Sequence, residues 1–228
     1  MPDVRPLSEK LAATRAFLDG LLELARPEET AVAFTGGKDS SLVLWLWREC
    51  LKRNGRAPLR AVSVDTGLKF PETLRFRDRL AAQLQAELTV ARPDVDLAAY
   101  PVARDPVACC RELKIAPLKR VLASAGVRLL LSGVRRDEHE SRRDRQAIEP
   151  REDPRHVLAN PILDWREMDV LAFTAEAGLP YCPLYGQGYR SLGCRPCTHR
   201  PGQADFERAG RNPDKERNLA LLHGLVYF

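Results

Sequence analysis

The 228-residue chain lacks the features that direct a protein to a membrane or out of the cell. It contains no run of about 18 apolar residues, which excludes a transmembrane helix. Residues 1–17 have no apolar core of the kind found in secretory signal peptides. Internal repeats, low-complexity stretches and linkers are also absent. We therefore expect a cytoplasmic protein without a membrane partner, folded as one domain over residues 1–228.

Lysine is scarce, with 7 Lys against 29 Arg, and the formal net charge is only +5. Arginine suits forked capture of phosphate, sulfate or carboxylate groups. The excess of positive charge is small, so an anionic small ligand explains it as well as a nucleic acid does, and so does a solvated surface. Residues 135–155 hold seven Arg and seven acidic residues, which argues against a strong nucleic-acid surface. A nucleic acid remains a secondary alternative.

Short apolar runs alternate with helical patterns through a core of about residues 28–178. The pattern predicts strands at 30–34, 60–65, 87–90 and 127–132, and helices at 8–24, 71–86 and 107–125. Such alternation indicates an α/β fold with a doubly wound, mostly parallel sheet. The charged stretch 135–155 reads either as a solvated loop or as a mobile lid that closes on an anion. Residues 179–228 form an irregular C-terminal region.

A glycine-rich loop between the first strand and the next helix is the most specific local motif. Its glycines allow close approach of a ligand, and the helix N-terminus that follows offers unpaired N–H groups. A lysine and two serines add donors, so the loop predicts a nest for phosphate oxygens. Its spacing differs from the Walker motif. The candidate binding residues are Thr35, Gly36, Gly37, Lys38, Asp39, Ser40 and Ser41.

Six cysteines are present, and four of them form two close pairs far apart in the sequence. Cys109 and Cys110 are adjacent, and Cys194 and Cys197 form a C-x-x-C. In a reducing compartment such pairs favour metal binding over disulfides. Four thiolates suit either Zn²⁺ or a [4Fe–4S] cluster, although adjacent cysteines are unusual at tetrahedral zinc sites. The alternative is a set of buried apolar cysteines and a plain loop pair.

The Gly-Gly-Lys-Asp-Ser loop resembles that of the PP-loop ATP pyrophosphatases, also called adenine nucleotide α-hydrolase-like proteins. Their motif begins with Ser where this chain has Thr35. The resemblance implies a cradle for pyrophosphate, cleavage of ATP between its α and β phosphates, and Mg²⁺ as a cofactor. It also implies catalytic roles for Lys38 and Asp39.

Two further stretches resemble the sulfate-activation branch of that superfamily. The first contains Asp65 and Thr66 in a VDTG-x-x-FPE pattern, and the second contains Gly133, Arg135 and Arg136 in a G-x-R-R-x-E pattern. The resemblance implies that these residues lie at the nucleotide. The two arginines could grip phosphate or sulfate in forked geometry, and the alternative is surface ion pairing with nearby acids.

The cysteine motifs, CC-x-x-x-K-x-x-PL and GY-x-S-x-GC-x-PCT, resemble those of iron–sulfur adenylylsulfate reductases in the phosphoadenylylsulfate reductase family. The resemblance implies a [4Fe–4S] cluster bound by Cys109, Cys110, Cys194 and Cys197. It covers about residues 30–200 and makes the C-terminal region, about 179–228, the part that bears the cluster.

Two departures from the reductase pattern bear on function. Reductases end in a Cys-Gly-x-His motif whose cysteine is the nucleophile, whereas this tail has only His223-Gly224 and no cysteine after Cys197. Reductases also carry a degenerate glycine loop, whereas this loop is intact. The combination favours an enzyme that adenylylates an acceptor with ATP and couples this step to sulfur transfer. Cys182 is a candidate nucleophile, or else a small buried residue.

Two other functions compete with this hypothesis. One is a reductase that forms sulfite from adenylylsulfate or phosphoadenylylsulfate, using Cys182 or a partner's thiol. The other is a non-catalytic module that senses nucleotides or redox state. The expected partners are a nucleotide and a small or sulfur-bearing substrate, with a sulfur donor or thiol reductant protein. A homodimer is compatible with the sequence, which names neither the acceptor nor the donor.

Overall fold

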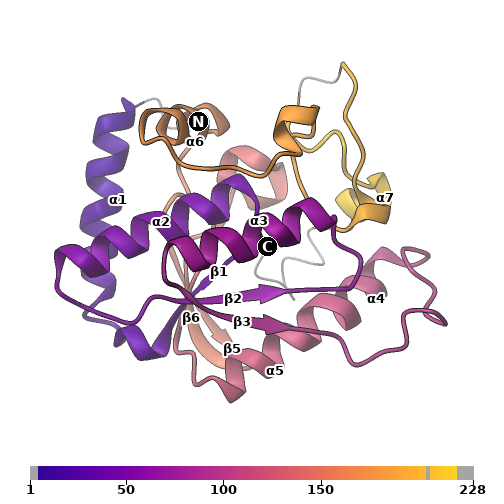
Figure 1. Ribbon diagram of the computed structural model, residues 1–228, viewed down its shortest axis with the longest axis horizontal. Coiled ribbons are helices and arrows are strands. Elements are labelled where there is room, and N and C mark those ends of the chain that lie inside the picture. Colours follow the sequence, from indigo (N-terminus) through magenta and orange to yellow (C-terminus); the bar gives the residue numbers. More distant parts are fainter. Residues whose placement is uncertain (1–4, 204–205, 220–228) are drawn as a thin grey trace.

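The computed structural model describes residues 5–203 and 206–219. Six strands form one sheet in the order β3-β2-β1-β4-β6-β5, and all neighbours are parallel except β5 and β6 (Figure 1). The strands are β1 (Thr30–Ala33), β2 (Arg60–Val64), β3 (Glu87–Ala91), β4 (Leu129–Leu131), β5 (Ile148–Glu152) and β6 (Arg155–Ala159). The helices are α1 (Leu7–Leu21), α2 (Lys38–Arg53), α3 (Pro71–Gln83), α4 (Pro106–Cys110), α5 (Ala116–Ser124), α6 (Glu167–Glu176) and α7 (Pro213–Arg217). None of the helices described here has both the length and the apolar character needed to cross a bilayer.

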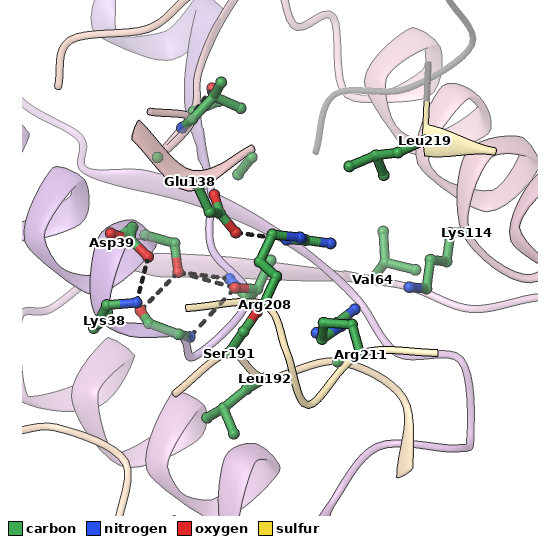
Figure 2. Close-up of a pocket in the computed structure, with 18 of the residues that line it drawn as sticks. Lys38, Asp39, Val64, Lys114, Glu138, Ser191, Leu192, Arg208, Arg211 and Leu219 are labelled. Atoms are coloured by element: carbon green, nitrogen blue, oxygen red, sulfur yellow. Dashed lines mark hydrogen bonds and ion pairs between the residues drawn. The ribbon is translucent and has the colours of Figure 1, made fainter. Parts of the chain in front are cut away.

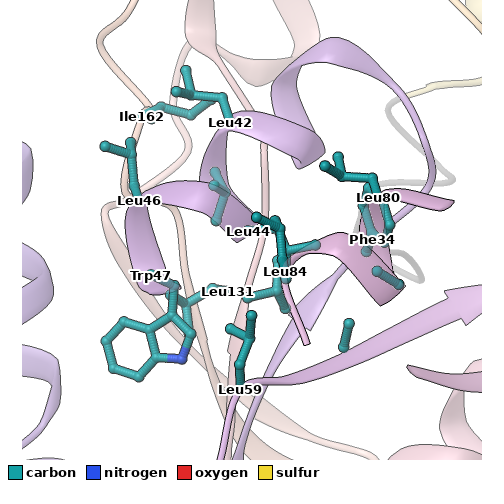
Figure 3. Packing of buried hydrophobic residues seen from close by; sticks show 14 of the residues in the cluster. Phe34, Leu42, Leu44, Leu46, Trp47, Leu59, Leu80, Leu84, Leu131 and Ile162 are labelled. Carbon is teal, nitrogen blue, oxygen red and sulfur yellow. The ribbon is translucent and has the colours of Figure 1, made fainter. Parts of the chain in front are cut away.

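Helices cover both faces of the sheet. Successive residues of a strand point to opposite faces, so each strand contributes to two separate cores. Val32 and Phe34 pack with α1, α2, α3 and α6 in the larger core, whereas Ala31 and Ala33 pack with α5 in the smaller one. Figure 3 shows Trp47 of α2 in the larger core near Leu131 of β4. The predicted α/β class with a doubly wound, mostly parallel sheet is therefore confirmed.

The strand order reverses between β1 and β4. From β1 the chain adds β2 and then β3 on one side, and it later adds β4 and β6 on the other. In such sheets ligands bind outside the carboxyl ends of the strands at this switch point. The loop 35–41 follows β1 and the segment 132–134 follows β4, so the fold brings two of the predicted motifs to one place.

Two expectations about local structure are corrected. The stretch 135–155 is neither a plain loop nor a lid, because it contains β5 and leads into β6, which pairs with β4 from Leu129↔Val157 to Leu131↔Ala159. The helix expected at 107–125 is divided by a π-helical stretch, Arg111–Ile115, between α4 and α5. Pro117 has no N–H to continue a regular helix through this point. The one-domain expectation extends beyond the described residues and stays a prediction.

A buried ion pair ties α1 to α6. The Lys10 ammonium lies 2.6 Å from a carboxylate oxygen of Asp169, which also accepts the Arg166 backbone N–H at 2.7 Å. Burial would raise the pKa of Asp169, but Lys10 and Arg166 lower it below its ordinary value. The carboxylate therefore stabilises the fold at neutral pH, and this contribution is lost as the pH falls through the lowered pKa.

We expect Asp169→Asn to lower the free energy of unfolding by about 3–5 kcal/mol, because it leaves the Lys10 charge buried without its carboxylate. Urea denaturation monitored by circular dichroism at pH 7 measures the change. Glu176→Gln, at an exposed position of the same helix, is the matched control and should leave the unfolding midpoint unchanged. Equal stability of the Asp169→Asn variant and the unmodified chain would contradict the assignment.

Candidate active site

A cleft opens at the carboxyl ends of β1 and β4. The space between its walls, counted together with the solvent at its open mouth, is about 1110 Å³. Figure 2 shows Lys38 and Asp39 on one side of this cleft and Lys114 and Arg211 on the other. Two of the lining side chains are acidic, Asp39 and Glu138, and seven are cationic: Lys38, Lys69, Lys114, Arg142, Arg208, Arg211 and Lys215. The cleft is therefore suited to a ligand with several negative charges.

The glycine loop forms one wall of the cleft at the start of α2. Gly37 caps the helix, and the Ser40 and Ser41 hydroxyls both donate to its carbonyl, at 3.0 and 2.9 Å. The Thr35 N–H donates to the Ser40 hydroxyl at 3.2 Å. Gly36 has a φ of +81°, which a side chain would strain. Of the predicted residues, Thr35, Gly37, Lys38, Asp39 and Ser40 line the cleft.

Gly133 lets the segment after β4 approach the glycine loop. A Cβ at this position would lie 2.8 Å from the Asp39 carbonyl carbon and 2.8 Å from the Ser40 backbone nitrogen. Both are backbone atoms at the first turn of α2, so neither can turn aside. Gly133 also lines the cleft. The resemblance of its motif implied a place at the nucleotide.

Lys38 and Arg135 share carboxylates deep in the site. The fully buried Arg135 donates to Asp39 at 2.7 Å and to Glu207 at 2.6 Å. The Lys38 ammonium pairs with Glu207 and donates to the Arg190 carbonyl at 3.2 Å. Burial disfavours the charged form of Lys38, but Asp39 and its other neighbours outweigh burial and raise its pKa. Lys38 thus stays cationic at physiological pH.

Three other predicted residues lie outside the group that lines the cleft. Arg136 pairs with Asp164 and donates to the carbonyls of Arg143 and Arg145, so it braces the segment after β4. Asp65 accepts the Gly67 N–H at 3.0 Å. Thr66 is buried, with its hydroxyl 3.3 Å from the Cys194 sulfur. Thr66 therefore contacts the cysteines and not the glycine loop.

The four paired cysteines line one small cavity beside the cleft. Cys109 and Cys110 end α4, which Asp105 caps. Cys194 precedes the 3₁₀ turn Arg195–Cys197, and Cys197 is its last residue. Cys110, Lys114 and Lys215 line both spaces, so they form the wall between them. In the part of the chain described here, no three side chains of metal-binding type are arranged around a single ion. Four thiols that border one cavity are the set of ligand types that a [4Fe–4S] cluster uses.

Four cations next to these thiols have no carboxylate partner. Within residues 5–203 and 206–219, Lys69, Lys114, Arg211 and Lys215 form no ion pair with an acid. The Arg211 Nε atom is buried and has no hydrogen-bond partner. Burial lowers the pKa of Lys69 to about 8, and burial with Lys114 and Arg211 lowers that of Lys215. Such buried cations are costly unless an anion compensates them.

These cations favour the ionised form of one thiol. Burial would raise the pKa of Cys194, but the Lys114 and Lys69 ammoniums outweigh burial and lower it to about 6. Burial raises the pKa of Cys109 and Cys197. Because the thiolate is the form that ligates metals, Cys194 is ready to ligate at neutral pH.

Cys182 does not lie where a nucleophile would have to lie. Its side chain is fully buried in the larger core, its sulfur lies 3.9 Å from the Thr73 hydroxyl, and burial raises its pKa. It is not among the residues that line the cleft or the cysteine cavity. The structure thus gives Cys182 a packing position and no access to a substrate.

The sequence interpretation missed a second group of site residues. Arg208, Arg211 and Lys215 come from the C-terminal region that the sequence pattern indicates only as irregular, and Tyr185 belongs to none of the motifs identified there. The available signal was the pair Arg208 and Arg211, separated by Ala-Gly and located shortly after Cys197, which could have indicated cations near the cysteines. The tail residues His223-Gly224 lie outside the described residues.

Three comparisons with known proteins bear on the site. The model of the phosphoadenosine phosphosulfate reductase domain matches residues 29–200. An adenosine 5'-phosphosulfate reductase of Streptomyces coelicolor is 36% identical over 72% of this chain and 71% of its own length. The structure resembles a phosphoadenylyl-sulfate reductase from Candida auris, with a TM-score of 0.64, 20% identity and coverage of 81% of this chain and 96% of that one. It also resembles a U34-tRNA thiolase from Methanococcus maripaludis, described with its [4Fe-4S] cluster, with a TM-score of 0.59, 18% identity and coverage of 76% and 65%.

We expect Gly133→Ala to weaken ATP binding by about 10-fold or more, because the new methyl group pushes the first turn of α2 out of place. Isothermal titration calorimetry with ATP and Mg²⁺ measures the affinity. The matched control is Gly20→Ala in α1, where a Cβ meets nothing within 4 Å. Unchanged affinity in the Gly133→Ala variant would show that this close approach does not shape the binding site.

Proposed function

This chain belongs to the phosphoadenosine phosphosulfate reductase family, and on that premise we propose that it cleaves ATP between the α and β phosphates, adenylylates an acceptor and serves sulfur transfer. One observation carries the proposal. The intact Gly-Gly-Lys-Asp-Ser loop lines the same cleft as the unpaired cations that separate it from the cysteine cavity. A triphosphate binding site and a sulfur site would then lie on either side of one wall.

The loop residues would act on the phosphates. The N-terminus of α2 and the Lys38 ammonium would bind the β and γ phosphates, and Asp39 would hold Mg²⁺ against them. An acceptor oxygen then attacks the α phosphorus, and the bond to the bridging oxygen breaks so that pyrophosphate leaves with its electron pair. Lys38 stabilises the charge that develops on the leaving group, and Arg135 keeps Asp39 in position.

The wall of cations would serve the second half of the reaction. Lys114 and Lys215 line both the cleft and the cysteine cavity, so cysteine thiolates there could offset their charges. Cys109, Cys110, Cys194 and Cys197 would hold a [4Fe–4S] cluster, whose chemistry is to hold or deliver sulfur. A sulfur nucleophile from a donor then replaces the adenylylated oxygen, and AMP leaves. The structural neighbour named as a thiolase with a [4Fe-4S] cluster supports this pairing.

A second candidate, supported by the relative named adenosine 5'-phosphosulfate reductase, is reduction of adenylylsulfate to sulfite. There a thiolate attacks the sulfur of adenylylsulfate, AMP leaves, and a second thiol releases sulfite as a disulfide forms. Cys50 and Cys182 are both fully buried in the larger core. On this candidate the attacking thiol would therefore come from a partner protein, and Cys182→Ala should leave sulfite release unchanged.

Pyrophosphate release from ATP and Mg²⁺ distinguishes the two candidates. We expect the anaerobically purified protein to release pyrophosphate in the presence of an acceptor, and Lys38→Met to slow release by about 10²–10³-fold because it removes one charged donor to the leaving group. A coupled pyrophosphate assay measures the rate. Lys52→Met, at an exposed position of the same helix, is the matched control and should retain full activity.

Sulfite release from adenylylsulfate with a dithiol reductant, and no pyrophosphate from ATP with any acceptor, would replace the proposal by the reductase. Tight nucleotide binding with neither product would instead indicate a sensing module.

We expect the anaerobically purified protein to be brown, with the broad visible absorption of an iron–sulfur cluster and about four iron atoms per chain. Cys194→Ser should abolish the colour, because it removes a ligand from the cavity. Cys50→Ser, far from the cavity in the larger core, should keep it. A colourless unmodified protein that carries zinc would contradict the cluster assignment.

A further inference from the structure

The carboxylate of Glu207 lies beside the glycine loop, on two cations that an anionic ligand of the loop could use. It pairs with the Lys38 ammonium and accepts from the Arg135 guanidinium at 2.6 Å. All three side chains are buried, with 6%, 4% and 0% of their surfaces exposed. Glu207 comes from a segment more than 160 residues further along the chain. Its carboxylate thus makes two charge-assisted contacts of the kind that a phosphate makes.

Other groups of the protein also use donors of the loop. The Tyr185 hydroxyl accepts the Lys38 backbone N–H at 2.9 Å, and the Thr35 hydroxyl accepts the Gly37 N–H at 3.3 Å. The Lys38 ammonium lies 5.6 Å from the centre of the Tyr185 ring. Donors at the start of a helix that face a cleft are the ones an anion uses. In this structure internal acceptors satisfy them.

The segment that carries Glu207 is tied to the cysteine loop. We call residues 206–212 the strap. The His199 N–H donates to the Gly210 carbonyl at 2.8 Å, and the Asn212 N–H donates to the Cys197 carbonyl at 3.1 Å. Arg208 in the strap donates to Glu138 at 2.5 Å and to Glu216 at 2.6 Å. Hydrogen bonds to the segment that carries Cys194 and Cys197, and ion pairs of Arg208, therefore hold the strap where Glu207 reaches the glycine loop.

We propose that Glu207 is an internal competitor for the nucleotide. The strap holds its carboxylate on Lys38 and Arg135, and the phosphates of an entering nucleotide displace it. The inference rests on nucleotide binding at residues 35–41, as proposed above. The last residue of the strap, Asn212, donates its N–H to the Cys197 carbonyl. The strap therefore connects the position of Glu207 to the segment that carries Cys194 and Cys197.

The competition has a defined thermodynamic consequence. If the protein spends most of its time with Glu207 on Lys38, the observed affinity for nucleotide falls by the fraction of molecules in which the site is open. Removing the negative charge removes this reduction. It also leaves Lys38 and Arg135 with less compensation, so the protein without ligand becomes less stable and a bound phosphate restores the loss.

The first test is Glu207→Gln in the full chain, titrated calorimetrically with ATP and separately with inorganic pyrophosphate. We expect both to bind about 10-fold or more tightly than to the unmodified protein. The melting temperature without ligand should fall, and the rise on adding ATP should be larger than for the unmodified protein. Glu152→Gln, at an exposed position on the edge strand β5, is the matched control and should change neither quantity.

A second variant moves the strap and keeps the Glu207 charge. A Cβ at Gly210 would overlap the His199 carbonyl oxygen, so Gly210→Ala must displace the strap where it joins the cysteine loop. We expect this variant also to bind pyrophosphate more tightly, by about 10-fold. It supplies an answer even where Glu207→Gln fails to fold.

The outcomes separate the two proposals. Equal or weaker binding of ATP and pyrophosphate in both variants, with clear binding to the unmodified protein, overturns the competition and leaves the proposed function intact. No binding of either ligand to any of the proteins overturns nucleotide binding at the loop, and with it the proposed function.

Discussion

Seven cationic side chains meet in one partly buried cleft, and each of them needs a compensating negative charge. The side near the glycine loop is compensated by the protein itself, because Asp39 and Glu207 pair with Lys38 and Arg135. On the side near the cysteines, Lys69, Lys114, Arg211 and Lys215 form no ion pair with an acid within residues 5–203 and 206–219, and the Cys194 thiol beside them is the group that Lys114 and Lys69 favour as an anion. The cations at the glycine loop are therefore paired within the protein. The cations next to the cysteines remain suited to an anionic group. The proposed ligand and cluster would draw on the same group of cations as the strap.

Close approach of backbones is what brings these charges together. The segment after β4 lies against the first turn of α2 because residue 133 has no side chain, and the strap lies against the cysteine loop because residue 210 has none. Both contacts join segments that are distant in the sequence. The sheet order places the ends of β1 and β4 side by side.

Much of the fold was predictable from local pattern. The strands at 30–34, 60–65 and 127–132 were recognisable because their residues are largely buried on both faces and read as apolar runs, and the edge strand at 87–90 was recognisable from its short apolar pattern. The strand Arg155–Ala159 was missed because charged residues surround it, and it becomes a strand only by pairing with β4. The divided helix was missed for a related reason, since its π-helical stretch departs from the regular spacing on which helix patterns depend.

The sequence by itself determined the α/β class, the glycine loop and the two cysteine pairs, because each depends on neighbouring residues or on a short spacing. Only the tertiary structure decided which of the candidate residues share a site. It placed Arg136 in a brace and Cys182 in the core, and it brought Arg208, Arg211 and Lys215 to the cleft and Glu207 to Lys38 and Arg135. Charge pairing between segments more than 100 residues apart depends on how the sheet is wound, and no local pattern records it.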